Sequence, residues 1–295
     1  MADKKSAMLY TRDARGRETA ERVPESLSFL YRTLPGRLCL SVLTKPALSR
    51  LAGAYLSSPL SRGLIDGFIR KNGIDMRDYE KRDYESFNDF FTRRIRPGRR
   101  PFDADPRALI APADARLSAY AIDDKSLFFI KGTPYSVGTL LRDRAQARAF
   151  RGGLCLIFRL TVGDYHRYCF FDDGVVLGGR FLPGVLHTVN PVALGGYDIY
   201  KENARAVTLL RTRSFGDAAQ VEVGAMLVGR ICNTHTGGFF FRGQEKGYFE
   251  YGGSTVVLLL RHGAAELRRD ILRNTADGVE TRVRQGERIG NAKRK

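Results

Sequence analysis

The sequence has no tryptophan, only four histidines and only four cysteines among its 295 residues. The cysteines lie far apart and form no CxxC pair, which excludes a disulfide framework and a zinc site of the usual spacing. No stretch approaches the roughly 20 consecutive apolar residues that span a bilayer. The first residues, MADKKSAMLYTRDARGRE, lack the apolar core of a secretory signal. We therefore expect no transmembrane helix, no signal peptide and a cytoplasmic protein.

Acidic residues are outnumbered, since 32 Asp and Glu stand against 49 Lys and Arg, for a formal net charge of +17. Such a chain is attracted to nucleic acid or to an anionic membrane surface. It has no zinc-finger spacing and no RNP-like aromatic motif, so we expect no nucleic-acid partner. At 34–72, apolar residues recur every three or four positions with Arg and Lys between them. This predicts two or three short amphipathic helices, interrupted near Pro46 and Pro59, that suit either a membrane surface or a helical cap.

The pattern changes after residue 100. Helical patterning covers about 26–96, whereas the following part has short apolar or alternating runs separated by Gly, Asn and Asp. Strands are predicted at 126–130, 153–162, 184–189, 206–213, 220–231, 237–241 and 254–261, and one helix at 136–150. The sequence thus predicts an α+β protein with a helical region over 1–100, a mainly antiparallel β domain over 101–266 and a charged tail over 267–295. We expect residues 1–25 to be poorly ordered or loosely docked and the tail to be mobile.

The segment GQEKGYFEYGGSTVVLLL, at 243–260, is the most unusual in the chain. A tight turn made by Gly252 and Gly253 before a buried strand is the simpler interpretation. The functional interpretation is an activated Ser254, although not in a GxSxG elbow, because a strand and no helix follows it. A serine directly after glycine allows attack on the preceding peptide carbonyl, given a base near its hydroxyl and donors for the oxyanion.

Two further segments offer partners for this serine. His166 lies in TVGDYHRYCFFDDG, where polar residues cluster at the end of a predicted strand, and Asp114 follows Ala-Pro-Ala in APADARLSAY. Taken singly, a hydrogen-bonded structural histidine and a turn aspartate are the simpler interpretations. Together with Ser254 they have the composition of a Ser-His-Asp set.

These segments resemble those of the phosphatidylserine decarboxylases, pyruvoyl-dependent enzymes that are made as self-cleaving proenzymes. The resemblance covers about residues 85–260, in the order of that family, and the serine motif and the YHR segment are its most specific parts. The matching segments are FNDFFTRRIRPGRRPFD (87–103), APADA (111–115), KGTPYSVGTLL (131–141), DYHRY (164–168), LHTVNPVAL (186–194), ENARAV (202–207), VEVGAMLVGRI (221–231) and KGYFEYGGST (246–255).

The resemblance implies that Ser254 attacks the Gly253 carbonyl, an N→O acyl shift that turns the peptide bond into an ester. β-Elimination and hydrolysis with loss of ammonia then leave a pyruvoyl group at 254, a β chain ending at Gly253 and an α chain beginning at 254. The pyruvoyl ketone forms a Schiff base with phosphatidylserine, which loses carbon dioxide to give phosphatidylethanolamine. Asp114, His166 and Ser254 are the implied catalytic residues, with His166 as the acid for the final protonation. No metal is implied.

Two positions depart from the family pattern. Members usually carry Y-H-R-x-H, and the second histidine is typically assigned as the base for self-cleavage, but here Cys169 takes its place. A thiol of ordinary pKa is a poor general base at neutral pH. We expect His166 to perform both steps, with His187 and Cys169 as secondary candidates. The other departure, Ala115 in place of glycine, affects only the turn.

A lipid substrate explains the basic charge, because each basic residue near an anionic membrane contributes about 1 kcal/mol of attraction. The resemblance therefore favours membrane docking by 34–72, peripheral attachment at the cytoplasmic face, and the chain's own β and α chains as partners. The oligomeric state stays open, a homodimer included. Three alternatives remain: a serine hydrolase that uses Asp114, His166 and Ser254 without self-cleavage, a basic nucleic-acid-binding protein, and a decarboxylase of a serine-containing ether lipid.

Overall fold

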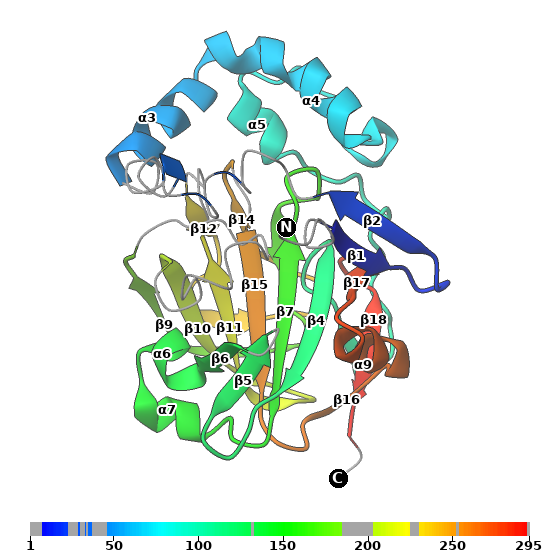
Figure 1. The fold of residues 1–295 in the computed structure, drawn as a ribbon, viewed down its shortest axis with the longest axis vertical. Coiled ribbons are helices and arrows are strands. Elements are labelled where there is room, and N and C mark those ends of the chain that lie inside the picture. The colour runs from blue at the N-terminus through cyan, green and yellow to red at the C-terminus, as the bar shows by residue number, and fades with distance from the viewer. Residues whose placement is uncertain are drawn as a thin grey trace.

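The centre of the protein is a ten-stranded sheet, shown in Figure 1. The computed structural model describes residues 8–22, 29, 33, 35–36, 46–130, 133–184, 203–224, 230–251 and 254–293. In spatial order the strands are β13 (Gly238–Phe240), β9 (Gly174–Leu182), β10 (Arg205–Thr212), β11 (Gly216–Val223), β15 (Ser254–Leu260), β7 (Leu154–Leu160), β4 (Ala115–Ala121), β17 (Glu280–Val283), β1 (Met8–Arg12) and β2 (Glu18–Arg22). Neighbouring strands are antiparallel except β1 and β17, which are parallel.

Both faces of the central strands are buried. Successive side chains of a strand point to opposite faces, and in this sheet each set enters a different core cluster. Val256 and Leu258 of β15 belong to one core cluster, whereas Val257 and Leu259 belong to the other. The first cluster includes side chains from two three-stranded sheets. One consists of β12 (Ile231–Asn233), β14 (Glu245–Phe249) and β8 (Arg167–Cys169), and the other of β16 (Ala265–Leu267), β18 (Arg288–Ala292) and β3 (Ala108–Ile110). The second includes side chains from the hairpin of β5 (Leu127–Ile130) and β6 (Thr133–Ser136) and from helices α6 (Val137–Leu141) and α7 (Arg144–Arg148).

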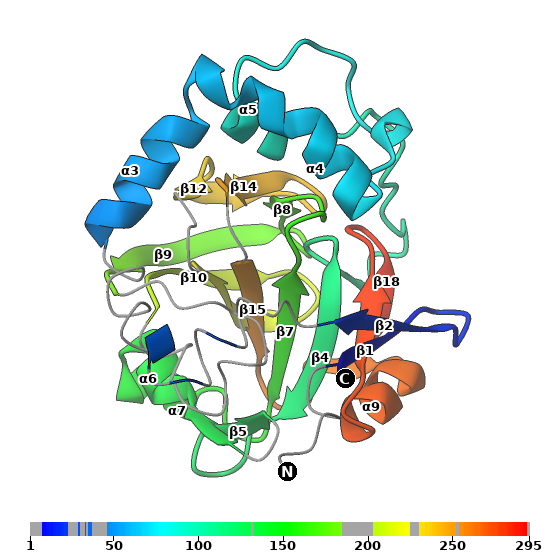
Figure 2. The same ribbon diagram turned by 45° about the horizontal axis from the view of Figure 1, so that its top comes forward.

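A helical cap lies across one end of the sheet, as Figures 1 and 2 show. It consists of α3 (Pro46–Leu56), the 3-10 helix η2 (Pro59–Leu64), α4 (Ile65–Asn72), the 3-10 helix η3 (Met76–Asp78) and α5 (Phe87–Phe91). Pro46 and Pro59 begin helices, since proline fits a first turn, where its missing N–H needs no partner. The cap has its own apolar cluster around Phe87, Phe90 and Phe91. Short helices are thus confirmed between residues 46 and 91, and the membrane role predicted for them remains a prediction. Over the described ranges, no helix is both long and apolar enough to cross a membrane.

Five predicted strands coincide with observed ones, namely β5, β7, β10, β13 and β15. The run at 220–231 divides, because β11 ends at Val223 and β12 begins at Ile231, and the run at 184–189 lies almost wholly outside the described residues. The helix predicted at 136–150 also divides. Arg142 adopts a left-handed conformation with φ 47°, and the Asp143 side chain then caps a second helix by accepting from the Gln146 N–H.

The described parts of the lead and the tail form strands, so the expected loose lead is wrong for residues 8–22 and the expected mobile tail is wrong for residues 267–293. Residues 8–22 form the β1–β2 hairpin, and β1 pairs with β17. The C-terminal part continues through β16, helix α9 (Arg269–Ala276), β17 and β18. In β17 the side chains of Thr281 and Val283 are buried while Arg282 is exposed. A strand with this alternation can form within a charged sequence, because only every second side chain is buried. The divisions at residues 100 and 266 stay a prediction.

Candidate active site

Backbone pairing brings the serine motif and the YHR segment to one end of the sheet. Ser254 is the first residue of β15 and lies opposite Leu160, the last residue of β7. The chain then turns through 161–166 to reach His166. The backbone carbonyl of His166 accepts a hydrogen bond from the backbone N–H of Phe249, the last residue of β14, at 2.9 Å. This end of the sheet faces the helical cap (Figure 1), and Gly253 lies outside the described residues.

The imidazole of His166 is enclosed by the cap. Only 1% of the residue is exposed, and the ring lies against Phe91 of α5 with a centroid separation of 4.1 Å. Phe91 also packs edge-on against Tyr251, three residues before Ser254, at 5.2 Å. One aromatic side chain of α5 therefore contacts both the histidine and the segment that leads into β15.

The hydrogen bond of His166 determines its tautomer. Nδ1 lies 2.9 Å from the backbone carbonyl oxygen of Asp164, and a carbonyl can only accept, so Nδ1 carries the proton. Nε2 is left with a lone pair and has no partner within the described part of the chain. Burial lowers the pKa of His166 to about 4 against the opposing charge of Asp164, and the nearby Arg93 charge acts in the same direction as burial. The ring is therefore neutral at pH 7, with Nε2 free to accept a proton.

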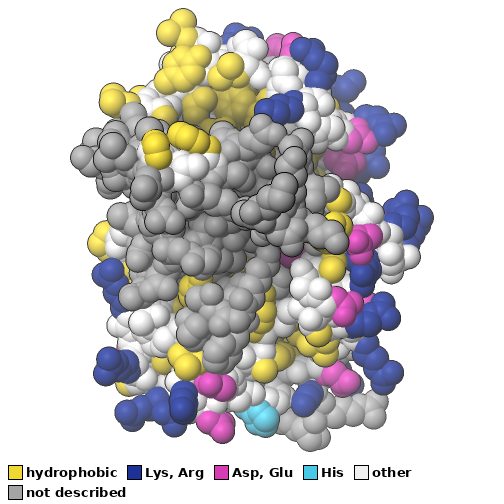
Figure 3. Space-filling view, in the orientation of Figure 1, with side chains coloured by type: hydrophobic (Ala, Val, Ile, Leu, Met, Phe, Trp, Pro, Cys, Tyr) yellow, Lys and Arg dark blue, Asp and Glu magenta, His cyan; other side chains and the backbone are white. Residues whose placement is uncertain are grey.

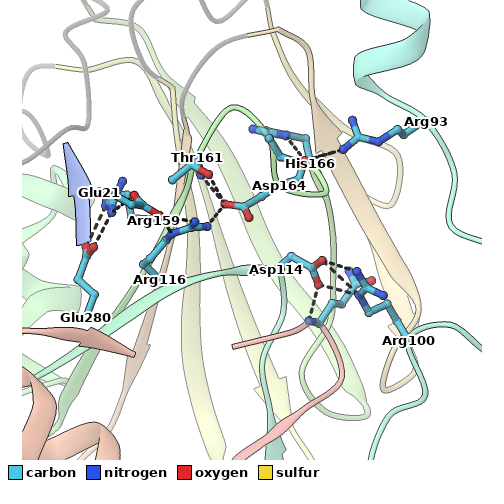
Figure 4. A network of polar contacts seen from close by, with 12 residues as sticks. Glu21, Arg93, Arg100, Asp114, Arg116, Arg159, Thr161, Asp164, His166 and Glu280 are labelled. Carbon is cyan, nitrogen blue, oxygen red and sulfur yellow. Dashed lines mark hydrogen bonds and ion pairs between the residues drawn. The ribbon is translucent and has the colours of Figure 1, made fainter. Parts of the chain in front are cut away.

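Asp164 fixes the turn that presents this carbonyl, as Figure 4 shows. Its carboxylate accepts the backbone N–H of Thr161 at 2.6 Å and the hydroxyl of Thr161 at 2.8 Å, and it pairs with Arg116. Burial alone would raise the pKa of Asp164, but Arg116 and the Thr161 donors outweigh it and lower that pKa. Asp164 is therefore a carboxylate at neutral pH, with its acceptors occupied by Arg116 and Thr161.

Arg93 holds the same turn from the side of the cap. Its Nη2 donates to the carbonyls of Gly163 and Asp164, both at 3.1 Å, and its guanidinium lies over the Tyr79 ring at 4.3 Å. Arg93 is only 2% exposed. A buried cation thus shares the Asp164 carbonyl with His166 and opposes a positive charge on the imidazole.

Asp114 is engaged elsewhere. Its carboxylate accepts from Arg100 Nη2 at 2.7 Å and Nε at 2.9 Å, and from the Gln285 backbone N–H at 2.8 Å. Figure 4 shows this group apart from the one around His166. The imidazole of His166 instead donates to the backbone carbonyl of Asp164, two residues earlier in the sequence. The prediction of a Ser-His-Asp set did not consider this carbonyl. Any role of Asp114 in the reaction stays a prediction.

Cys169 and His187 are the secondary candidates for the base of self-cleavage. Cys169 lies in β8 and is 2% exposed, and burial raises the pKa of its thiol to about 12. Its thiolate is therefore scarce at neutral pH, which argues against Cys169 as the base. His187 lies outside the described residues.

A buried ion pair lies close to the start of β15. Lys246 Nζ of β14 lies 2.7 Å from Glu222 of β11, and both side chains are fully buried. Asn233 accepts from Lys246 at 3.1 Å and from the Tyr168 hydroxyl at 3.0 Å. Glu222 pairs in register with Val256, two residues after Ser254. The described ranges contain no group of three or more His, Cys, Asp or Glu side chains placed to hold a metal ion.

Comparisons with known proteins agree on one family. The family model described as phosphatidylserine decarboxylase matches residues 87–291, from α5 to β18. The chain is similar to the phosphatidylserine decarboxylase proenzyme 2 of Clostridium acetobutylicum, with 46% identity over 90% of this chain and 91% of that protein. It is also similar to the phosphatidylserine decarboxylase proenzymes of Ruminiclostridium cellulolyticum, at 41% identity over 90% of each chain, and of Fusobacterium nucleatum, at 36% over 91% of each.

Proposed function

The chain belongs to the phosphatidylserine decarboxylase family, and on that premise we propose that it makes its own pyruvoyl group by self-cleavage between Gly253 and Ser254. With this group it converts phosphatidylserine to phosphatidylethanolamine and carbon dioxide, as a carboxy-lyase. The observation that carries the proposal is the buried Nε2 of His166, which has no partner among the described residues and lies at the end of the sheet where β15 begins.

His166 suits the self-cleavage step. Its neutral ring takes the hydroxyl proton of Ser254 as the oxygen attacks the Gly253 carbonyl, and returns it to the amide nitrogen that leaves. The low pKa of His166, about 4, makes the protonated ring a strong acid, so the proton is returned readily. The Asp164 carbonyl keeps Nδ1 protonated, so that only Nε2 exchanges a proton with the reacting groups.

The residues around position 254 also fit a pyruvoyl group held there by the chain itself. Such a group supplies an electrophilic carbonyl and an electron sink that no ordinary side chain offers. His166 stays within the same buried end of the sheet, where Nε2 can take up a proton released by the incoming amino group of the substrate and give it to the product, and Phe91 packs against both His166 and Tyr251 there. The serine hydrolase alternative gains no support, because the Asp114 carboxylate that it requires is bound to Arg100.

We also propose that the helical cap docks the enzyme peripherally on an anionic membrane, the source of the lipid substrate. Leu51 of α3 is 69% exposed and Leu60 of η2 is 82% exposed, and Tyr55 and Leu64 of the same helices are exposed with them, so the cap carries several exposed apolar side chains. Among the basic residues, Arg62 lies in η2 and Lys71 in the following helix, α4. Figure 3 shows apolar side chains gathered over the cap, with basic ones beside them. This combination is typical of helices that lie in a membrane interface.

The test is intact mass spectrometry of the purified protein, with a decarboxylation assay on phosphatidylserine in mixed micelles. We expect two chains, 1–253 and 254–295, the smaller without its amino group, and release of carbon dioxide from the lipid. Ser254→Ala should remain one inactive chain, and His166→Gln should cleave about 10²- to 10⁴-fold more slowly, the usual contribution of a general base.

Two results would count against the proposal. A folded wild-type chain that stays intact and releases no carbon dioxide would refute it. An intact chain that hydrolyses esters, and loses that activity in Ser254→Ala, would establish the hydrolase instead.

A further inference from the structure

The β1–β2 hairpin precedes the segment matched by the family model, yet one of its side chains is linked through Arg116 to the turn at 161–166 that holds His166. Glu21 of β2 accepts from Arg116 Nε at 3.0 Å and from Arg116 Nη2 at 2.5 Å. The remaining terminal nitrogen of this guanidinium, Nη1, donates to the Asp164 carboxylate. Figure 4 shows Arg116 between the two carboxylates. An ion-paired chain therefore runs from the N-terminal hairpin to the residue that holds His166.

Asp164 transmits this constraint because its two polar ends have different partners. Its carboxylate is held by Arg116 and Thr161, while its backbone carbonyl accepts from Nδ1 of His166. A rotation of the carboxylate away from Arg116 would loosen the turn and move the carbonyl that orients the imidazole. The position of Arg116 therefore bears on the geometry at Nε2.

Arg116 needs both carboxylates to stay in place. Its side chain is only 10% exposed, and without Glu21 its Nε and Nη2 groups would be buried donors without their acceptor. A buried donor left unpaired is costly, so the guanidinium would move toward other acceptors and weaken its contact with Asp164. The neighbouring Arg159 pairs with Glu280 at 2.5 Å and also lies 3.8 Å from Glu21, so Glu21 is shared by two arginines, and Arg116 is the one that contacts Asp164.

We propose that Glu21 is a positioning residue for His166, which acts through Arg116 and Asp164 to hold the imidazole with Nε2 free for proton transfer. The inference rests on the proposed role of His166 in self-cleavage and decarboxylation. It makes the N-terminal hairpin a component of the active site.

The experiment compares four variants of the full chain with the wild type. Glu21→Ala should slow self-cleavage and lower kcat about tenfold with KM unchanged, the size expected for a charged hydrogen bond. Glu21→Gln should recover most of the rate, because its amide oxygen still accepts from Arg116. Asp164→Asn weakens the next contact of the same chain and should lower kcat in the same way, which covers the case in which Glu21→Ala does not fold.

Glu18→Ala is the matched control, because it removes a carboxylate of the same strand that pairs with Arg12 and leaves the Arg116–Asp164 contact in place. It should leave both rates unchanged, and the melting temperatures of all variants show whether the fold is retained. If Glu21→Ala cleaves and turns over like the wild type, or loses only as much as Glu18→Ala, the role of Glu21 is overturned. If the wild type itself neither cleaves nor decarboxylates, the proposed function fails, and the role of Glu21 fails with it.

Discussion

The carbonyl oxygen of Asp164 lies 2.9 Å from Nδ1 of His166, so the imidazole is oriented by a backbone group. A carboxylate in this place would stabilise the imidazolium and raise its pKa, whereas a neutral carbonyl does so only weakly. The Asp164 carboxylate is held by Arg116 and Thr161, and the Arg93 cation shares the carbonyl. These contacts favour a neutral ring, which is the form that can accept a proton from Ser254.

This arrangement predicts how self-cleavage depends on pH. Only neutral His166 can act as a base, so the rate should stay level between about pH 5.5 and 8 and fall as pH drops through about 4, the pKa of His166. The nearby Asp164 carboxylate opposes the lowering of the His166 pKa, and its own lowered pKa keeps it charged over this range, so this opposing effect stays constant. The measurement is the cleavage rate of freshly refolded proenzyme, with near-UV circular dichroism to confirm that the fold persists. A midpoint near 6.5, the ordinary value for histidine, would contradict a desolvated His166.

Cys169 offers a second prediction, because it occupies the place of the family's usual second histidine. Its buried thiol has a pKa of about 12, so a thiolate base is disfavoured at neutral pH. Cys169→Ser should therefore cleave within about twofold of the wild-type rate, since serine is close in size and cannot form an anion here. Rates from intact mass spectrometry decide the matter, with Cys155→Ser as a control for replacing a buried thiol. Loss of cleavage in Cys169→Ser alone would make Cys169 the base.

The Lys246–Glu222 pair predicts a stability effect. Lys246→Met leaves the Glu222 carboxylate buried without its cation, and removing one partner of a buried pair typically costs about 3–5 kcal/mol. Lys246→Met should thus lower the free energy of unfolding of the Ser254→Ala proenzyme by about 3 kcal/mol, measured by urea denaturation. The double variant Lys246→Met/Glu222→Leu should recover most of the loss, because no charge is then left buried. Strictly additive losses would show that the two side chains do not stabilise each other.

The exposed leucines of the cap predict membrane affinity. Replacing both Leu51 and Leu60 by serine should weaken binding to vesicles of anionic phospholipid by about tenfold or more, because two exposed apolar side chains no longer enter the interface. Co-sedimentation with vesicles measures the bound fraction. Leu272→Ser is the matched control, since Leu272 is 45% exposed but lies in α9, away from the cap (Figure 1). If all three proteins bind equally, the cap is not the docking surface.

Local sequence patterns were sufficient to predict several strands and helices and the candidate site segments. The apolar runs that became β7 and β15 are long and bounded by turn residues, so their conformation follows from composition over a few positions. The glycine pair before Ser254 and the polar cluster at His166 could likewise be recognised from neighbouring residues. The amphipathic helices were also predictable, and the breaks expected near Pro46 and Pro59 agree with the structure, in which α3 begins at Pro46 and η2 at Pro59.

The partners of the charged side chains depended on the tertiary structure. Glu21 and Arg116 are separated by 95 positions, and Asp114 meets Gln285 across 171. A local pattern of hydrophobicity carries no information about which distant charges meet, because those contacts arise only when the strands pair. For the same reason the polar lead and the charged tail gave no sign that they form strands of the central sheet. The sequence by itself determined the family and made Ser254 and His166 the candidates for the reaction, whereas the folding of distant segments onto one sheet decided which groups orient that histidine and keep it neutral.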